Sequence, residues 1–335
     1  MTIEKLENWY LENQRKFNFR GTTNPYYIWI SEIMLQQTQA ETVEPYYAKF
    51  IQRFPTIESL ANANEEDIKR LVEGIGYYRR FSNLKKAAIE IMTLHNETFP
   101  TTYDALLSLS GIGKYTAGAI LSIAYNQPYS ALDGNVIRVL SRYLGDRGDM
   151  RKEKEKKRLD AYNQSMIEKA NPRIYTQAMI ELGALVCRPK NPKCSICPLN
   201  EQCFAFHNNL VTELPYLAKM KKQKVIHYIV CILEDEEHYF LRKRTENLLE
   251  GMYEWPQFER ESVFSALNDL SGSGIDAELL EDMGTYQHVF SHQIWEMDVF
   301  QFRVIKNEST AYHKILKKDI LKYPMAIAHR KIKTA

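Results

Sequence analysis

The chain has 335 residues, a formal net charge of +2 and 44% hydrophobic residues. Its length suits two domains, and its near-neutral charge excludes nucleic-acid binding through a global positive field. No apolar run approaches the roughly 18–20 residues of a membrane span, and the first residues lack the basic and apolar regions of a signal peptide. We therefore expect no membrane partner and a cytoplasmic location.

Apolar residues recur at helical spacing through the first two-thirds of the chain. Asn24 and Pro25 form a cap followed by a helix-opening proline. No run alternates convincingly before residue 220. Helices are predicted over 3–10, 26–39, 56–61, 65–73, 78–95, 103–109, 136–144, 152–169 and 174–186.

A Gly-x-Gly motif, Gly111-Ile112-Gly113, stands between an apolar run and a run of small residues. Such a Gly-x-Gly can end one helix and open another, so that free N–H groups at the new helix N-terminus bind phosphate. An ordinary tight turn between helices is the alternative. Twenty residues later, Asp133-Gly134-Asn135 places a carboxylate where another helix begins.

Four of the five cysteines lie close together, with the spacing Cys187-x6-Cys194-x2-Cys197-x5-Cys203. Thiolates so close in sequence predict a metal centre in a reducing compartment, with zinc and an iron–sulfur cluster as the candidates. Cys231 lies in a strand pattern and is expected in a core.

The composition changes near residue 214. A basic segment over 215–224 suits a linker, and an α+β module is expected beyond it, with strands over 225–233, 239–243 and 293–304 and helices over 263–270 and 314–321. The three predicted parts are residues 1–214, 215–224 and 225–335.

Glu32 lies in the predicted helix 26–39, among apolar residues. Burial would raise the pKa of its carboxyl group, as a general acid at neutral pH requires, whereas an exposed glutamate is the alternative. The run Pro-Tyr-Tyr-Ile-Trp-Ile-Ser-Glu-Ile-Met-Leu-Gln-Gln-Thr over 25–38 closely resembles the signature of MutY-type adenine DNA glycosylases, which are helix-hairpin-helix-Gly-x-Asp enzymes. The resemblance continues through Gly74-Ile75-Gly76-Tyr77-Tyr78, the Gly-x-Gly, 132–136, the cysteine cluster and 290–292.

This resemblance implies an all-α two-lobed glycosylase domain over 1–214, with its helix-hairpin-helix at about 103–125 and a cluster loop at 187–203. A smaller Nudix-like α+β domain would follow. It implies base excision repair of adenine paired with 8-oxoguanine or guanine, on double-stranded DNA at the bacterial nucleoid, by a monomer. We find no Nudix metal box in 261–274, so the second domain is expected to read the lesion and not to hydrolyse pyrophosphates.

The resemblance also implies roles for individual residues. Glu32 would protonate adenine, Asp133 would stabilise the sugar cation, and Asn135 would hold the carboxylate or the water. Tyr115 stands where bifunctional relatives have a lysine, which predicts a monofunctional enzyme. The implied cofactor is a [4Fe–4S] cluster held by Cys187, Cys194, Cys197 and Cys203.

Further residues are implied to contact DNA. Arg20 and Gln177 would contact the adenine pocket, although Phe17-Asn18-Phe19-Arg20 departs from the usual Leu-Pro-Trp-Arg. Tyr77 would be a wedge, with Gln37 and Thr38 lining the vacated stack. Phe290, Ser291 and His292 would read 8-oxoguanine. The candidate phosphate contacts are Gly111, Gly113, Lys114, Arg188, Lys190 and Lys193.

Two other functions are alternatives to an adenine DNA glycosylase. A bifunctional endonuclease III-like enzyme would attack oxidised pyrimidines, but Tyr115 and the second domain argue against it. A non-catalytic DNA-binding module would use the hairpin and cluster as scaffold, but Glu32 and Asp133 argue against that.

Overall fold

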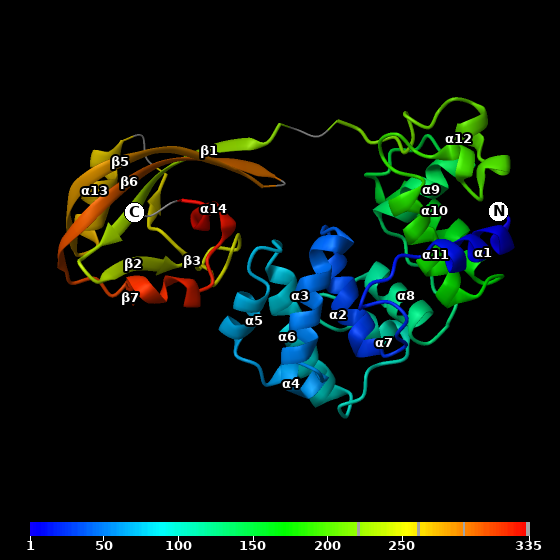
Figure 1. Ribbon diagram of the computed structural model, residues 1–335, viewed down its shortest axis with the longest axis horizontal. Helices are drawn as coiled ribbons and strands as arrows, with labels where there is room; N and C mark the ends of the chain where they lie inside the picture. Colours follow the sequence, from blue (N-terminus) through cyan, green and yellow to red (C-terminus); the bar gives the residue numbers. More distant parts are fainter. Residues whose placement is uncertain (220–221, 260–261, 291, 333–335) are drawn as a thin grey trace. The chain divides into compact units, whose positions relative to one another are not determined.

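The computed structural model describes residues 1–219, 222–259, 262–290 and 292–332. Its contacts divide the chain into two units, Met1–Ala63 with Ser82–Lys219, and Asn64–Phe81 with Met220–Ala335. Among the described residues, the regular elements before residue 219 are all helices, and strands are found only after it (Figure 1). None of the described helices is both long and apolar enough to cross a membrane.

The predicted helices occur in the predicted order, and several of them begin at a capping side chain. The side chain of Asn24 accepts from Tyr26 N, with Pro25 at the first helical position, as the sequence predicts. The helices are α1 (Ile3–Asn13), α2 (Pro25–Leu35), α3 (Ala40–Arg53), α4 (Ile57–Ala61), α5 (Glu65–Leu71), α6 (Arg79–Leu94), α7 (Tyr103–Leu107), α8 (Lys114–Ile123), α9 (Gly134–Leu144), α10 (Glu153–Ile167), α11 (Pro172–Leu185) and α12 (Phe204–His207), with 3₁₀ turns η1 (Cys194–Ile196) and η2 (Asn200–Gln202).

The C-terminal module is built on a mixed sheet in the order β3-β2-β1-β6-β5, in which β4 pairs with β1, β7 pairs with β2, and β1 and β6 run parallel. Its elements are β1 (Lys224–Glu234), β2 (His238–Lys243), β3 (Tyr253–Glu254), β4 (Gln257–Phe258), α13 (Val263–Gly272), β5 (Ile275–Val289), β6 (Gln293–Asn307), β7 (Tyr312–Leu316), η3 (Lys317–Lys322) and α14 (Ile327–Arg330).

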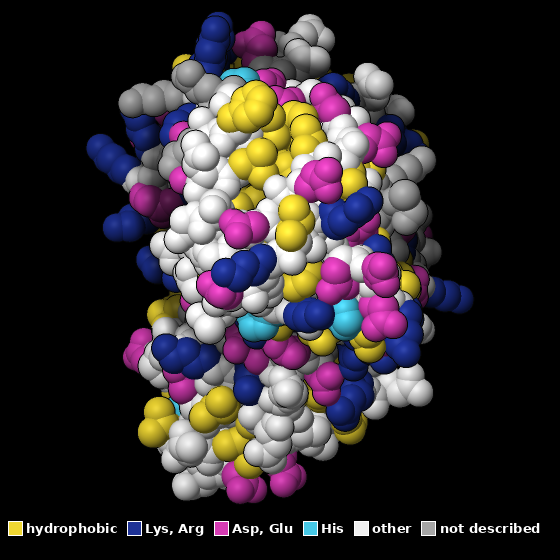
Figure 2. All heavy atoms as spheres, turned by 90° about the vertical axis from the view of Figure 1, so that its left-hand side faces the viewer, with side chains coloured by type: hydrophobic (Ala, Val, Ile, Leu, Met, Phe, Trp, Pro, Cys, Tyr) yellow, Lys and Arg dark blue, Asp and Glu magenta, His cyan; other side chains and the backbone are white. Residues whose placement is uncertain are grey.

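Strand β1 separates the two cores of this module. Val230 and Ile232 face one core, which contains Trp295, whereas Cys231 and Leu233 face the other, which is covered by α13. This alternation follows from the period of two residues in a strand. Cys231 is therefore a core residue, as predicted. On the face shown in Figure 2, acidic and basic side chains are interspersed, in keeping with the low net charge.

Two predicted elements are wrong. Residues 314–321 were expected to be helical, but β7 occupies 312–316 and only η3 is helical. Ile315 pairs with Tyr239 of β2 and is buried, so pairing at the sheet edge outweighs local helix preference. The helix predicted over 26–39 ends at Leu35, because Gln37 has a positive φ of 58°.

Candidate active site

Glu32 is buried in the middle of α2, with only 1% of its surface exposed. The Tyr115 hydroxyl donates a 2.6 Å hydrogen bond to its Oε2. Burial raises the pKa of the Glu32 carboxyl group and the nearby Asp133 adds to that effect, while Arg20 and the Tyr115 hydrogen bond oppose it. The predicted rise in pKa is thus confirmed, and the group can remain a proton donor at higher pH than an exposed glutamate.

Asp133 is the N-cap of α9, as predicted. Its Oδ1 accepts from Val136 N at 2.7 Å, and its Oδ2 accepts from Asn135 Nδ2 at 2.8 Å. Burial raises the pKa of Asp133, whereas these hydrogen bonds and Arg138 oppose the rise. Because all of these contacts stabilise the ionised form, Asp133 is the better placed of the two acids to carry a negative charge.

Tyr115 lies in the first turn of α8, and the charges of Glu32 and Asp133 both act on its hydroxyl group. Burial raises the pKa of its hydroxyl well above the ordinary value, and Glu32 and Asp133 raise it further. The side chain therefore stays a neutral hydrogen-bond donor. Lys114, one residue earlier, is exposed, because consecutive helical residues point about 100° apart.

Arg20 and Gln177 are brought together, with Arg20 Nη1 donating to Gln177 Oε1 at 3.4 Å. Phe19 stands where the family usually has tryptophan, and the Arg20 guanidinium lies 5.5 Å from the centroid of its ring. Phe19 is only 2% exposed and stacks on Phe17 at 4.9 Å between centroids. The structure thus places the Phe19 ring in an aromatic core.

The Gly-x-Gly joins α7 to α8, with Gly113 as the N-cap of α8. Gly111 has a φ of +77°, and a Cβ there would lie 2.7 Å from Asn83 Cβ of α6, so only glycine fits. Helix α6 also supplies Glu90, whose carboxylate accepts from Ser110 N at 2.7 Å and from Ser110 Oγ at 2.6 Å. Sequence reasoning missed Glu90, since nothing local marks a carboxylate that holds a turn twenty residues away.

Arg138 is a second residue that the sequence analysis missed. It donates to Asn135 Oδ1 at 2.7 Å, to Gly183 O at 2.8 Å and to Cys187 O at 2.7 Å. It thereby joins the Asp133–Asn135 pair to the beginning of the cysteine loop. Because Arg138 follows Asn135 by three residues on a helix, the sequence could indicate its contact with Asn135. The sequence gives no sign of its contacts with Gly183 and Cys187.

The four clustered cysteines line one small cavity together with Arg142. No three side chains among them converge closely enough to hold a single metal ion. Burial raises the pKa of Cys197 to about 12, and the neighbouring thiols add to that rise. A cationic centre would compensate for the cost of four partly buried thiolates, so this donor set fits a metal cluster.

Arg142 fixes the loop that carries these cysteines. It donates to Arg188 O and Leu214 O, each at 2.8 Å, and its Nη1 lies 3.4 Å from Cys187 Sγ. The basic side chains of Arg188, Lys190 and Lys193 are exposed on this loop. They are therefore accessible to phosphates.

The remaining candidates lie on exposed or irregular backbone. Gln37 is exposed, and Thr38 is half-buried. Tyr77 is 47% exposed and has a φ of +52°, an uncommon conformation for a residue with a large side chain. Phe290 is half-buried and His292 is exposed. Ser291 lies outside the described residues.

Three family models match this chain. Residues 30–164 match the HhH-GPD superfamily base excision DNA repair protein, residues 187–203 match the iron–sulfur binding domain of endonuclease III, and residues 228–335 match the NUDIX domain. Together these matches cover the helices with the two acids, the cysteine loop and most of the sheet module. The predicted fold class is confirmed.

Similar proteins extend over most of the chain. An adenine DNA glycosylase of Buchnera aphidicola subsp. Acyrthosiphon pisum is 36% identical over 89% of this chain and 85% of the relative. An adenine DNA glycosylase of Schizosaccharomyces pombe is 31% identical over 86% and 72%, respectively.

Solved structures resemble the helical part. A thermostable thymine-DNA glycosylase is 26% identical, with a TM-score of 0.57, over 62% of this chain and 95% of that one. A non-covalent endonuclease III–DNA complex is 20% identical, with a TM-score of 0.52, over 62% and 94%, and shows the fold alone.

Proposed function

This chain belongs to the adenine DNA glycosylases, which act on N-glycosyl bonds in base excision repair, and from that membership we propose that it removes adenine paired with 8-oxoguanine or guanine. The observation that supports the catalytic part is the group in which Glu32 and Asp133 interact electrostatically while Tyr115 is hydrogen-bonded to Glu32. We also propose that the protein acts as a monomer, because these three residues need no contribution from a second copy. We propose 1–214 as the catalytic domain, 215–224 as the linker and 225–335 as the lesion-reading domain.

The reaction requires the adenine to leave the duplex, since its glycosidic bond is inaccessible in the stack. We propose that Arg20 and Gln177 contact the edge of the extruded adenine. Their side chains meet at 3.4 Å. Tyr77 would enter the stack as a wedge, and Gln37 and Thr38 would line the vacated space. The phosphates would be held by the α8 N-terminus, with Gly111, Gly113 and Lys114, and by Arg188, Lys190 and Lys193.

Two carboxyl groups divide the chemistry. Protonated Glu32 donates a proton to adenine N7, so that the base leaves as a neutral molecule. The sugar becomes an oxocarbenium-like cation, which the Asp133 carboxylate stabilises. Asn135 holds that carboxylate at 2.8 Å, and Glu32, now ionised, accepts a proton from the attacking water. With Tyr115 in place of a lysine, no amine attacks the sugar, and the product is an abasic site without strand scission.

Lesion reading is assigned to Phe290, Ser291 and His292. 8-Oxoguanine has an N7–H donor where guanine has an acceptor, and a serine hydroxyl can accept from that donor. Guanine would place two acceptors opposite each other, although a hydroxyl can also donate and so reduce the difference. We therefore expect a discrimination of about 1–3 kcal/mol, the usual value of one specific base contact.

The assay that tests this function uses duplexes with A opposite 8-oxoguanine, A opposite G, or thymine glycol. Free base and strand breaks are scored with and without alkali. We expect adenine release from the first two, scission only after alkali, and a lower preference for 8-oxoguanine in the Phe290→Ala/Ser291→Ala variant. Cleavage of thymine glycol, scission without alkali, or a double variant with the full preference would contradict the proposal.

The cofactor of this chain is a [4Fe–4S] cluster, and we propose Cys187, Cys194, Cys197 and Cys203 as its ligands. The wild type should be brown and contain about four irons per chain. Replacing Cys197 by serine is expected to remove the colour and most of the iron. DNA affinity should also fall, since the loop with Arg188 would lose its anchor. Iron analysis, visible absorption and binding to an uncleavable duplex measure these effects.

Cys231→Ala is the matched control for the cluster, because Cys231 is fully buried in β1 and packs in the C-terminal core. It should keep the iron and the DNA affinity. Full iron content in Cys197→Ser, or stoichiometric zinc in the wild type purified without air, would contradict the assignment.

A further inference from the structure

Trp295 is the centre of an aromatic cluster near the end of the β5–β6 hairpin. It is 1% exposed, and its ring contacts Tyr228 at 5.2 Å and Phe290 at 4.7 Å between centroids. It is paired with His288 across the hairpin. Such edge-on ring contacts are specific in geometry and each contributes to the rigidity of the cluster.

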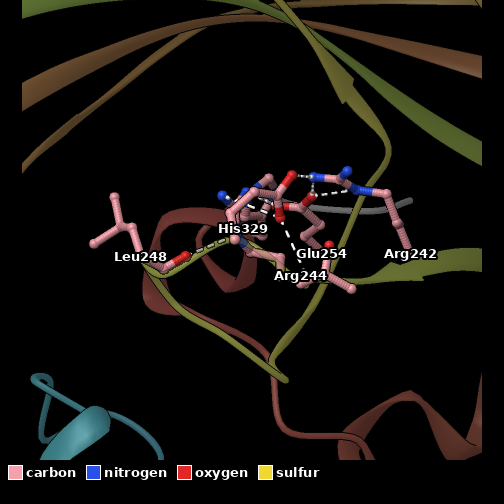
Figure 3. A network of polar contacts seen from close by, with 7 residues as sticks. Arg242, Arg244, Leu248, Glu254 and His329 are labelled. Atoms are coloured by element: carbon pink, nitrogen blue, oxygen red, sulfur yellow. Dashed lines mark hydrogen bonds and ion pairs between the residues drawn. The ribbon is translucent and has the colours of Figure 1, made fainter.

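Arg244 also contacts the Trp295 ring. Its guanidinium carbon lies 5.3 Å from the centroid of the Trp295 ring, as in a cation–π contact. The guanidinium is itself fixed by two acceptors, Leu248 O at 2.9 Å and Glu254 Oε2 at 2.5 Å (Figure 3). Arg244 is 6% exposed and therefore cannot exchange these contacts freely with water.

Glu254 is the anion that makes this arrangement stable. It is fully buried, and its Oε1 accepts from Arg242 Nε at 2.7 Å (Figure 3). Burial alone would raise the pKa of Glu254, but His329, Arg244 and Arg242 together lower it to about 2. The carboxylate is ionised throughout the working pH range, so Arg244 keeps its partner and its position over Trp295.

Phe290 belongs to this network and is the last described residue before position 291. Its ring contacts Trp295 and, at 4.6 Å, His288. Its N–H donates to Gln293 O at 2.8 Å, and its carbonyl oxygen accepts from Gln223 Nε2 at 2.7 Å. The backbone of Phe290 is therefore held by hydrogen bonds, and the Phe290 ring is held by Trp295.

We propose that Arg244 and Trp295 are positioning residues for lesion discrimination: the ion-paired guanidinium holds the indole, and the indole sets the placement of Phe290. This inference rests on the proposed role of Phe290, Ser291 and His292. A side chain that contacts the lesion distinguishes two bases only when its position is fixed, since a mobile one can adapt to either, and Phe290 is the described residue that this network holds. Discrimination is then determined partly by residues that touch no DNA.

The test compares Trp295→Leu with Trp255→Leu. The two tryptophans belong to the same core, are 1% and 2% exposed, and both have an indole Nε1 without a hydrogen-bond partner among the described residues. Trp255 packs on Tyr239 at 5.0 Å and has no ring contact with Phe290 in the described structure. Both substitutions should therefore lower the Tm of this module, but only Trp295→Leu should change the reading of the lesion.

The readout is the ratio of single-turnover cleavage, and of binding, for A opposite 8-oxoguanine over A opposite G. We expect Trp295→Leu to lower this ratio about two- to tenfold, the effect of losing one aromatic pair, with cleavage of A opposite G nearly unchanged. Arg244→Lys should lower it less, since lysine keeps the charge without the planar stack. Trp295→Phe and Trp255→Phe serve in the same way if the leucine variants do not fold.

An unchanged ratio in a folded Trp295 variant, or an equal fall in the Trp255 control, would overturn the inference. In that case the wild type would still prefer 8-oxoguanine, and the proposed function would stand. A wild type without any preference would refute the proposed lesion reading itself, and the positioning role with it.

Discussion

Glu32→Gln is expected to lower the single-turnover rate of adenine release by about 10²–10⁴-fold, the usual contribution of a general acid. Glutamine has the same shape and can still accept the hydrogen bond that Tyr115 donates to Glu32 at 2.6 Å. It cannot donate a proton to the leaving base. Binding to an uncleavable duplex should be retained, because the loss lies in the transition state.

The stability of this variant provides its internal control. The folded-state pKa of Glu32 is raised, chiefly by burial, so its protonated form stabilises the fold at low pH, and this stabilisation is lost as the pH rises through the raised pKa. Glu32→Gln should consequently unfold at the same or a higher temperature than the wild type at neutral pH, with no such advantage in acid. A Tm well below that of the wild type would mean that the rate loss reflects damage to the fold.

The same shift in pKa predicts the form of the pH profile. Activity requires protonated Glu32, so the rate of adenine release should fall as the pH rises through the raised pKa of this group. In Glu32→Gln that alkaline limb should disappear from the residual activity. An identical profile in both proteins, or a rate within about tenfold of the wild type, would assign the acid to another residue.

The sequence predicts the helical elements well, because their apolar periodicity and caps are local signals. It does not predict α3, in which Pro45 lies inside the helix and removes one backbone donor. The buried stripe of Val43, Tyr47 and Phe50 outweighs that loss. Packing energy, which depends on the partner helices, decides the outcome there.

The strands are less predictable for a similar reason. β5 is largely exposed and carries several acidic residues, and its ladder with β6 contains bulges. Its strand conformation follows from the backbone hydrogen bonds that β6 offers and not from alternation. Residues 314–321 were misassigned because the free edge of β2 is invisible in the local sequence.

In the site, sequence reasoning proposes the residues that would carry the chemistry and misses those that hold them in place. Glu32 and Asp133 are predicted from the resemblance to adenine DNA glycosylases, because a glutamate in an apolar helix and an acid before a helix start are weak signals by themselves. Glu90, Arg138 and Arg142 were not, since each acts across a long sequence separation on backbone atoms. Their role depends on the tertiary arrangement, which no local pattern encodes.

Asp133→Asn is expected to lower the rate of adenine release at least about 10²-fold, since one preorganised electrostatic contact contributes roughly 10²–10³ to a rate. The side chain caps α9 through Val136 N at 2.7 Å, and asparagine caps a helix as well as aspartate. The variant therefore keeps the helix start. It loses the charge proposed to stabilise the sugar cation and, because an amide has a single oxygen, also the acceptor that Asn135 Nδ2 uses at 2.8 Å.

Asp133→Ala separates the two roles of this side chain. It should show the same loss of rate and, in addition, a loss of about 1 kcal/mol in the free energy of unfolding from the missing cap. Thermal unfolding and single-turnover cleavage of one duplex, measured on all three proteins, give both quantities. If Asp133→Asn cleaved within about tenfold of the wild type while Asp133→Ala did not, the capping role alone would account for this residue, and the oxocarbenium-like cation would have to be stabilised by another group.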